Sequence, residues 1–264
     1  MRSLLRAGLL LGVLAAACKD SIGPKSLADP QATTAQMATL DTLFDISALN
    51  SFSALSGEIA PVAPARVATL RALAAVSNPL ARTSALRPYV QGAEAAQTVR
   101  RLLPTLTDAN AAALFPPEVV GKTFEWNDTT NMYRPTARAG APSTGVRFIL
   151  YAVDPFTSLP VVPLVEVGYV DLDDESTASV AKVHVTVAGV GGVPVYVDYV
   201  VTLSGSESSA RITSTGYITN GAGSPDTLRF NGVISASGNQ TSATVTQDVT
   251  LDVNSRDVHV RLSE

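Results

Sequence analysis

The sequence predicts a mainly β protein of the α+β class, in which a long-stranded antiparallel meander forms a curved sheet or barrel. Two observations predict it. Between residues 183 and 262, apolar and polar side chains alternate, and such period-two alternation places the apolar residues on one face of a strand. Turns rich in glycine and asparagine recur about every sixteen residues, which leaves strands of about ten residues. Turns this short can join only antiparallel neighbours, so we expect an up-and-down meander.

The alternation can be followed strand by strand through the C-terminal half. Its apolar positions begin at Val183, Val185 and Val187 and continue at every second residue through 193–203, 228–236, 245–253 and 258–262. The opposite face is mainly Thr, Ser and Asp, a composition that is suited to water. The predicted turns carry Gly and Asn, which accept positive φ at little cost. One apolar face along long strands needs a cover, or the sheet must close on itself.

The β region begins before this run. Residues 122–126 and 132–133 flank a turn at 127–129, and Phe124 and Trp126 share a face. The segments 146–153 and 164–170 are apolar on both faces. Strands of this kind should be covered on both sides, and we expect an N-terminal layer of helices to supply the cover.

The helical layer is predicted in residues 37–117. Apolar residues recur with helical spacing in several short stretches, which prolines interrupt. Short helices of this kind need the sheet to stay folded. The predicted organisation is therefore a leader at 1–17, a tether at 18–36 and a single domain at 37–264. That domain comprises the helical segment 37–117 and the antiparallel meander 118–264.

The first eighteen residues have the pattern of an export signal. Arg2 and Arg6 precede a short apolar core at 9–14, and three alanines then lead to Cys18, which is the sole cysteine of the chain. The apolar core is too short to span a bilayer as a permanent helix. An exposed free thiol is a liability in an oxidising compartment, which favours a modified Cys18.

This segment resembles a bacterial lipoprotein signal. The resemblance implies that Cys18 is diacylated on sulfur and becomes the first residue of the processed protein. The leucine that the family favours three residues before the cysteine is Ala15 here. Lys19 follows the cysteine directly, and Asp20 comes only after it, which by the same resemblance favours the outer membrane over the inner one. The alternative is an ordinary signal peptide that is cleaved near an unrelated cysteine.

An acylated Cys18 makes the membrane the first expected partner of the protein, which would be anchored to the bilayer rather than span it. The side of the outer membrane on which the domain lies stays open. Residues 19–36 contain Gly23-Pro24 and Asp29-Pro30 with little apolar content, which is typical of a flexible tether. The net charge of −4, together with export, disfavours nucleic acid as a partner.

The densest group of carboxylates is Asp171, Asp173, Asp174 and Glu175. Oxygen ligands at this density are a candidate Ca²⁺ site. However, the glycine that an EF-hand-type loop needs at its sixth position is Ser176, and a solvated hairpin loop is the favoured interpretation. The two histidines, His184 and His259, lie on the polar face by parity, and we expect both at the surface. The sequence indicates no catalytic residues and no cofactor, and it leaves enzymatic activity open.

Three functions of different classes remain open. The first is an envelope-anchored binding or structural module without catalysis, with an envelope protein as a possible partner. The second is a carrier of a lipid or another apolar ligand, held between the curved sheet and the helices in a cavity lined by Phe148, Tyr169 and Phe230. In outline such a carrier is similar to periplasmic lipoprotein carriers and lipocalins, an analogy of fold alone. The third, a transmembrane barrel, lacks the expected aromatic girdles and a terminal aromatic residue.

Overall fold

The computed structural model describes residues 31, 46–55, 114–206, 209–221, 227–238, 243–253 and 256–263. The chain divides after Met37, and every element described below belongs to the unit Ala38–Glu264. The predicted leader, Cys18 with its predicted lipidation, and nearly all of the predicted tether lie outside the described residues. So do all the predicted helices after residue 55.

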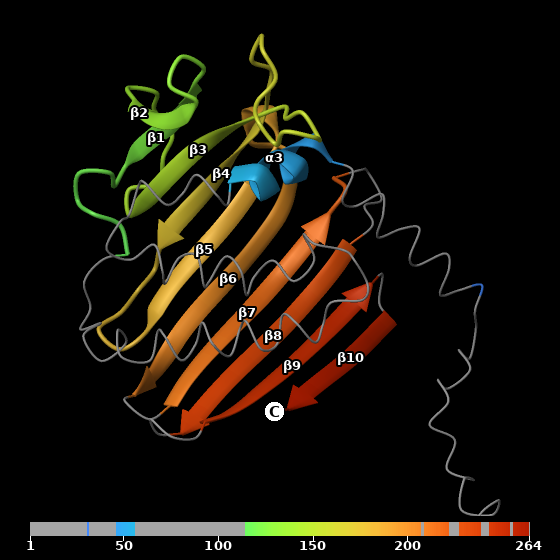
Figure 1. Ribbon diagram of the computed structural model, residues 1–264. Helices are drawn as coiled ribbons and strands as arrows, with labels where there is room; N and C mark the ends of the chain where they lie inside the picture. Colours follow the sequence, from blue (N-terminus) through green and yellow to red (C-terminus); the bar gives the residue numbers. More distant parts are fainter. Residues whose placement is uncertain are drawn as a thin grey trace, which may run out of the picture. The chain divides into compact units, whose positions relative to one another are not determined.

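Ten strands form one sheet, with the order β10-β9-β8-β7-β6-β5-β4-β3-β1-β2 (Figure 1). The strands are β1 (Lys122–Asn127), β2 (Met132–Thr136), β3 (Gly145–Tyr151), β4 (Glu166–Asp174), β5 (Ala181–Ala188), β6 (Val195–Ser206), β7 (Ser209–Thr219), β8 (Thr227–Gly238), β9 (Ala243–Val253) and β10 (Arg256–Ser263). From β3 to β10 each strand pairs antiparallel with the next along the chain, which confirms the predicted meander. The sheet is open, with β10 and β2 at its edges, so of the two predicted forms it is not the barrel.

The first two strands depart from the predicted topology. β1 and β2 form an antiparallel hairpin, but β1 lies parallel to β3, with Lys122 opposite Val146 and Phe124 opposite Phe148. The sheet is therefore mixed rather than wholly antiparallel. The reason is the segment 137–144, which follows β2 and returns the chain to the side of β1. As a result β3 enters beside β1 and leaves β2 at the edge.

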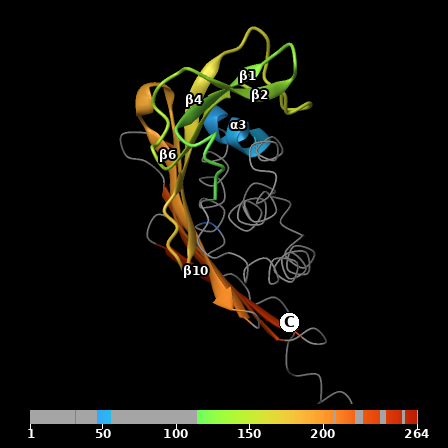
Figure 2. The ribbon, with the colours of Figure 1, turned by 90° about the vertical axis from the view of Figure 1, so that its left-hand side faces the viewer.

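One α-helix is described over its full length, α3 (Ser47–Leu55), on one side of the sheet (Figure 2). Its buried side chains Ala48, Leu49 and Leu55 join the cluster formed by the strands. Ser51 Oγ donates a hydrogen bond of 2.5 Å to the carbonyl oxygen of Tyr151, at the end of β3. This helix falls within the helical segment predicted from the sequence, whereas a layer of several helices stays a prediction. No described helix is long and apolar enough to cross a membrane.

The main core lies on the side of the sheet that faces α3, which we call the apolar face. The register keeps the alternating residues in line: Val170, Val187 and Val197 occupy one row across β4, β5 and β6. Valines on β5 and β6 are almost fully buried there, as the alternation predicted. The opposite side of the sheet is the polar face.

A second, smaller apolar cluster lies at the β1–β2 end of the sheet, around Ile149 and Tyr151, which project from the polar face of β3. Trp126, Ile149 and Tyr151 are buried there, with Tyr133 and Leu164 against them. β3 is therefore covered on both faces, as its apolar sequence required. In the described part of the chain, the cover of the second face comes from the β1–β2 hairpin and the segment before β4, and the helical cover that we expected there stays a prediction. Two aromatic residues on a short hairpin supply enough apolar area for this purpose.

Candidate functional site

The three residues predicted to line a cavity do not lie on one face. Phe148 is fully buried on the apolar face and stacks on Phe124, with ring centroids 4.9 Å apart. Phe230 lies on the same face. Tyr169 pairs with Ile149 across β4 and β3, and it belongs to the cluster on the polar face. The structure thus brings two of the three predicted residues to one side of the sheet and places the third on the other side.

Small residues form a row on the apolar face between two aromatic side chains. Gly216 on β7 stands between Tyr199 on β6 and Phe230 on β8, and the two rings approach to 5.9 Å between centroids. Ser214, one position along the same face of β7, stands opposite Gly232 on β8. Because glycine has no side chain, no side chain rises from the apolar face of the sheet at Gly216 and Gly232.

The hydroxyl of Ser214 is an unusual feature of this row. The residue is 4% exposed, and its Oγ has no hydrogen-bond partner in the described part of the chain. Leaving a buried hydroxyl unsatisfied costs about 1–3 kcal/mol. A group of this kind is a candidate contact for a polar atom on an otherwise apolar ligand.

The acidic run is not the hairpin loop that we expected. Asp171, Asp173 and Asp174 belong to β4, because the antiparallel register with β5 continues as far as the pair Asp174–Val183. Alternation along the strand then turns neighbouring carboxylates to opposite faces. Each finds its own partner: Asp171 binds Arg147, Thr144 donates to Asp173, and Asp174 accepts the Leu114 N–H at 2.6 Å. Among the described residues no three potential metal ligands form a group.

The remaining carboxylate, Glu175, belongs to a charged cluster on the polar face. Lys182 Nζ lies 2.5 Å from Glu175 Oε2, and His184 lies between Glu175 and Asp198, with Nδ1 3.4 Å from Glu175 Oε1 and Nε2 2.9 Å from Asp198 Oδ1. His184 is thus partly exposed on the polar face, as predicted. His259 falls in the same backbone row, but four strands separate β10 from β5, about 24 Å at the usual strand spacing.

The ion pair with Lys182 makes the contribution of Glu175 depend on pH. The hydrogen bond from Lys182 holds the pKa of Glu175 below its usual range, so the pair stabilises the fold above the pKa of the unfolded chain. That stability is lost as the pH falls through the lower pKa of the folded protein. Because both side chains are partly exposed, we expect Glu175→Gln to lower the free energy of unfolding at pH 7 by less than about 1 kcal/mol.

Urea titrations at several pH values test this expectation. The difference between the wild type and Glu175→Gln should begin to shrink as the pH falls through about 4.3, the usual pKa of a glutamate, and disappear below the lowered pKa of the folded protein. The exposed Glu118→Gln is the matched control. A difference that stayed constant down to acid pH would show that the charge of Glu175 is not the cause.

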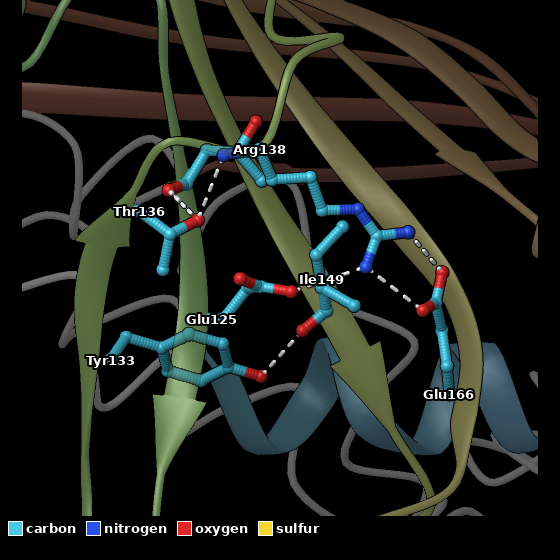
Figure 3. Close-up of polar contacts among 7 residues, drawn as sticks. Glu125, Tyr133, Thr136, Arg138, Ile149 and Glu166 are labelled. Carbon is cyan, nitrogen blue, oxygen red and sulfur yellow. Dashed lines mark hydrogen bonds and ion pairs between the residues drawn. The ribbon is translucent and has the colours of Figure 1, made fainter.

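A second charged cluster joins the β1–β2 hairpin to β4 (Figure 3). Arg138, which follows β2, donates to both carboxylate oxygens of Glu166 at 3.0 and 2.7 Å and to Glu125 at 3.2 Å. These two carboxylates raise the pKa of the guanidinium of Arg138, mainly through the hydrogen bond to Glu166. Beside it, Tyr133 Oη donates to the Ile149 carbonyl oxygen at 2.9 Å. The contacts tie the hairpin to the strands that it covers.

Arg147 forms the third charged contact of the polar face. Its Nε and Nη2 each lie 2.7 Å from an oxygen of Asp171, which is a bidentate geometry, and its Cζ stands 3.7 Å above the ring of Tyr169. The hydrogen bond to Asp171 raises the pKa of Arg147. Nearby, burial raises the pKa of Tyr151 to about 12, with Glu125 and Glu166 adding to the effect. Arg147 is thus paired with Asp171 across strands, a geometry that stabilises the sheet.

The sequence analysis missed a set of exposed apolar residues at one end of the sheet. In the described part of the chain, all large exposed hydrophobic side chains lie on two connections between strands. One is the β3–β4 connection, and the other is the β5–β6 connection, which contains the 3₁₀ turn η2 (Val190–Gly192). The residues are Phe156, Leu159, Val161, Val162, Val165, Val190 and Val193. The signal in the sequence is the absence of charge, since no Asp, Glu, Lys or Arg occurs in 155–165 or in 187–197. Loops normally carry polar residues.

Comparison with known proteins gives no match: no family model, no curated protein and no solved structure is similar to this chain.

Proposed function

We propose that this protein is a lipid-anchored lipoprotein of the cell envelope, and that its sheet is a non-catalytic binding or structural module with an envelope protein as a possible partner. The observation that carries the proposal is the position of Cys18. The sole cysteine of the chain follows directly on a leader with a positive start and a short apolar core. The order of Lys19 and Asp20 favours the outer membrane.

The charged side chains of the polar face support a structural rather than a chemical role for that face. Arg138, Arg147 and Lys182 each contact a carboxylate on another strand or loop. Ion pairs of this kind help to set the alignment of strands. The charged groups in them are already paired with a carboxylate and are less available to act on a substrate.

Mass spectrometry of the protein that is purified from membranes tests the anchor. We expect the N-terminal peptide to begin at Cys18 and to carry two or three acyl chains, each of which adds about 0.8 kcal/mol of membrane affinity per buried methylene. The Cys18→Ala protein should lose this modification. An unmodified thiol at Cys18, or a processed chain that begins elsewhere, would contradict the proposal.

A second candidate function is favoured by the hydroxyl of Ser214, which has no hydrogen-bond partner among the described residues. A carrier of a lipid or another apolar ligand would place the ligand on the apolar face beside Gly216 and Gly232. There the ligand could offer a polar atom to Ser214 Oγ. Of the lining residues that the sequence predicted, Phe148 and Phe230 lie on this face and Tyr169 does not, so the carrier proposal now rests on the row of small residues.

Ser214→Ala separates a structural hydroxyl from a ligand contact. In ligand-free protein the change should raise the free energy of unfolding, by up to about 1 kcal/mol, because it removes a buried polar atom for which the described part of the chain offers no partner. In protein that copurifies with a ligand, the same change should lower the occupancy seen by native mass spectrometry. The conservative Ser214→Thr, which keeps the hydroxyl, should retain the ligand. If no variant carries a ligand, the carrier proposal fails.

A further inference from the structure

We propose that the end of the sheet with the exposed apolar residues is a membrane-contact surface that inserts into the interface of a lipid bilayer. The surface consists of residues 152–165 and 189–194, which we call the apolar loops. The inference rests on the proposed envelope location and adds a second contact to the proposed acyl anchor.

The two apolar loops lie at the same end of the sheet. Tyr151 and Glu166 pair at the base of the first loop, and Ala188 and Val195 pair at the base of the second. The antiparallel order of β3 to β6 puts both connections at one end, and Figures 1 and 2 show them there together with α3. The most exposed side chains are Phe156 at 95%, Val193 at 75% and Val162 at 65%.

The loops are built in a way that suits insertion. A backbone N–H that enters hydrocarbon without a partner costs several kcal/mol. Pro155, Pro160, Pro163 and Pro194 carry no N–H. Many of the remaining donors are already satisfied within the loops, and these hydrogen bonds are Asp154 N to Leu159 O, Ser158 N to Asp154 O, Val161 N to Ala152 O, Gly189 N to Pro194 O and Gly192 N to Gly189 O.

Asp154 presents the most exposed aromatic ring. Its Oδ1 accepts the N–H groups of Phe156 at 2.8 Å and of Thr157 at 2.9 Å, which fixes the turn that carries Phe156 outward. These hydrogen bonds hold the pKa of Asp154 below its usual range. The ring is thus displayed by a preformed turn, and little conformational entropy is lost when it enters another phase.

A bilayer fits this surface better than a protein partner does. Protein interfaces depend on Trp, Tyr and Arg as energetic centres, whereas the exposed side chains here are Phe, Leu and Val. The loops contain no charge except Asp154, so the contact needs no anionic lipid. The helix α3 lies at this same end, where Ser51 donates to the carbonyl oxygen of Tyr151. The proposed acyl anchor at Cys18 would be a separate contact with the same bilayer.

Site-specific labels test the inference. Cys18→Ala removes the only native thiol, so a single new cysteine can carry a polarity-sensitive fluorophore. We would compare Phe156→Cys with Ser179→Cys, an exposed position in the β4–β5 connection at the opposite end of the sheet. With vesicles of phosphatidylcholine, the label at position 156 should shift to the blue and be quenched by a lipid-borne quencher. The label at position 179 should remain in water.

A second variant gives the size of the effect. Val162→Asp with Val193→Asp, added to the Phe156→Cys chain, should lower the membrane-inserted fraction of the label at least about tenfold. Its thermal midpoint should not change, because both valines are exposed. A label at 156 that stays in water beside vesicles would overturn the inference. So would a blue shift without vesicles that grows with protein concentration, since it would assign the surface to a second copy of the chain. Neither outcome depends on acylation, because these chains lack Cys18.

Discussion

Phe148→Ala should lower the free energy of unfolding by about 3–5 kcal/mol, the range found when a fully buried aromatic ring is deleted from a core. Phe148 has no exposed surface and contacts two other rings, stacking on Phe124 at 4.9 Å and meeting the edge of Tyr133 at 5.4 Å between centroids. It therefore joins the main core to the β1–β2 hairpin. Urea unfolding can be followed through Trp126, the only tryptophan, which packs on Tyr133.

The matched control for this prediction is Phe156→Ala, because it removes the same atoms from a ring that is 95% exposed. We expect its free energy of unfolding to stay within about 0.5 kcal/mol of the wild type. Phe148→Leu, which keeps most of the buried volume, should lose less than Phe148→Ala. Equal losses at positions 148 and 156 would contradict the placement of Phe148 in the core.

Gly216→Val should lower the free energy of unfolding by about 1–3 kcal/mol or more through overpacking. A side chain at this position would overlap the carbonyl oxygen of Asp198 and the Cβ of Tyr199 on the neighbouring strand. It would also enter the space in which the rings of Tyr199 and Phe230 meet. The two strands would have to move apart, because the contacted atoms belong to the backbone of Asp198 and the Cβ of Tyr199, which cannot move away by a side-chain rotation.

The sign of the change at Gly216→Ala is the sharper test. Alanine is favoured over glycine inside a strand by roughly 0.5–1 kcal/mol on entropic grounds, so a gain in stability is expected wherever space is available. We expect a loss at position 216, and a gain would contradict the close approach of β6. Thr215→Ala, at an exposed position of the same strand, should change stability by less than about 0.5 kcal/mol.

The antiparallel part of the fold could be predicted because its signals are local. From β5 onward each strand carries one apolar face, and the connections between strands contain glycine or asparagine, except the one between β6 and β7, where Ser206 pairs with Ser209. The register follows, because a slip by one residue would turn residues such as Val185 and Tyr199 to water. The single parallel pair, β1 with β3, could not be predicted in this way, since nothing within residues 122–126 specifies which later strand will lie beside them.

Side-chain partners were harder to predict than strands. The run Asp171 to Glu175 has the composition of a loop, but Arg147 on β3 and Lys182 on β5 neutralise part of its charge and keep most of it within β4. Those partners lie far away in sequence. The sequence analysis predicts Tyr169 and Phe148 in the lining of one cavity, although the register puts them on opposite faces. The apolar loops were missed because apolar residues in an irregular segment have no periodicity to reveal them.

The contact between Ser51 and Tyr151 has a consequence for how the chain becomes folded. Paired strands within the meander are near neighbours in sequence, so the sheet can form one hairpin at a time as each strand becomes available. The helix α3 must instead close a loop of 100 residues to reach the end of β3. Whenever the chain emerges from its N-terminus, as it does during synthesis, this helix is exposed long before its docking place exists. We therefore expect α3 to settle late, onto a sheet that has already assembled.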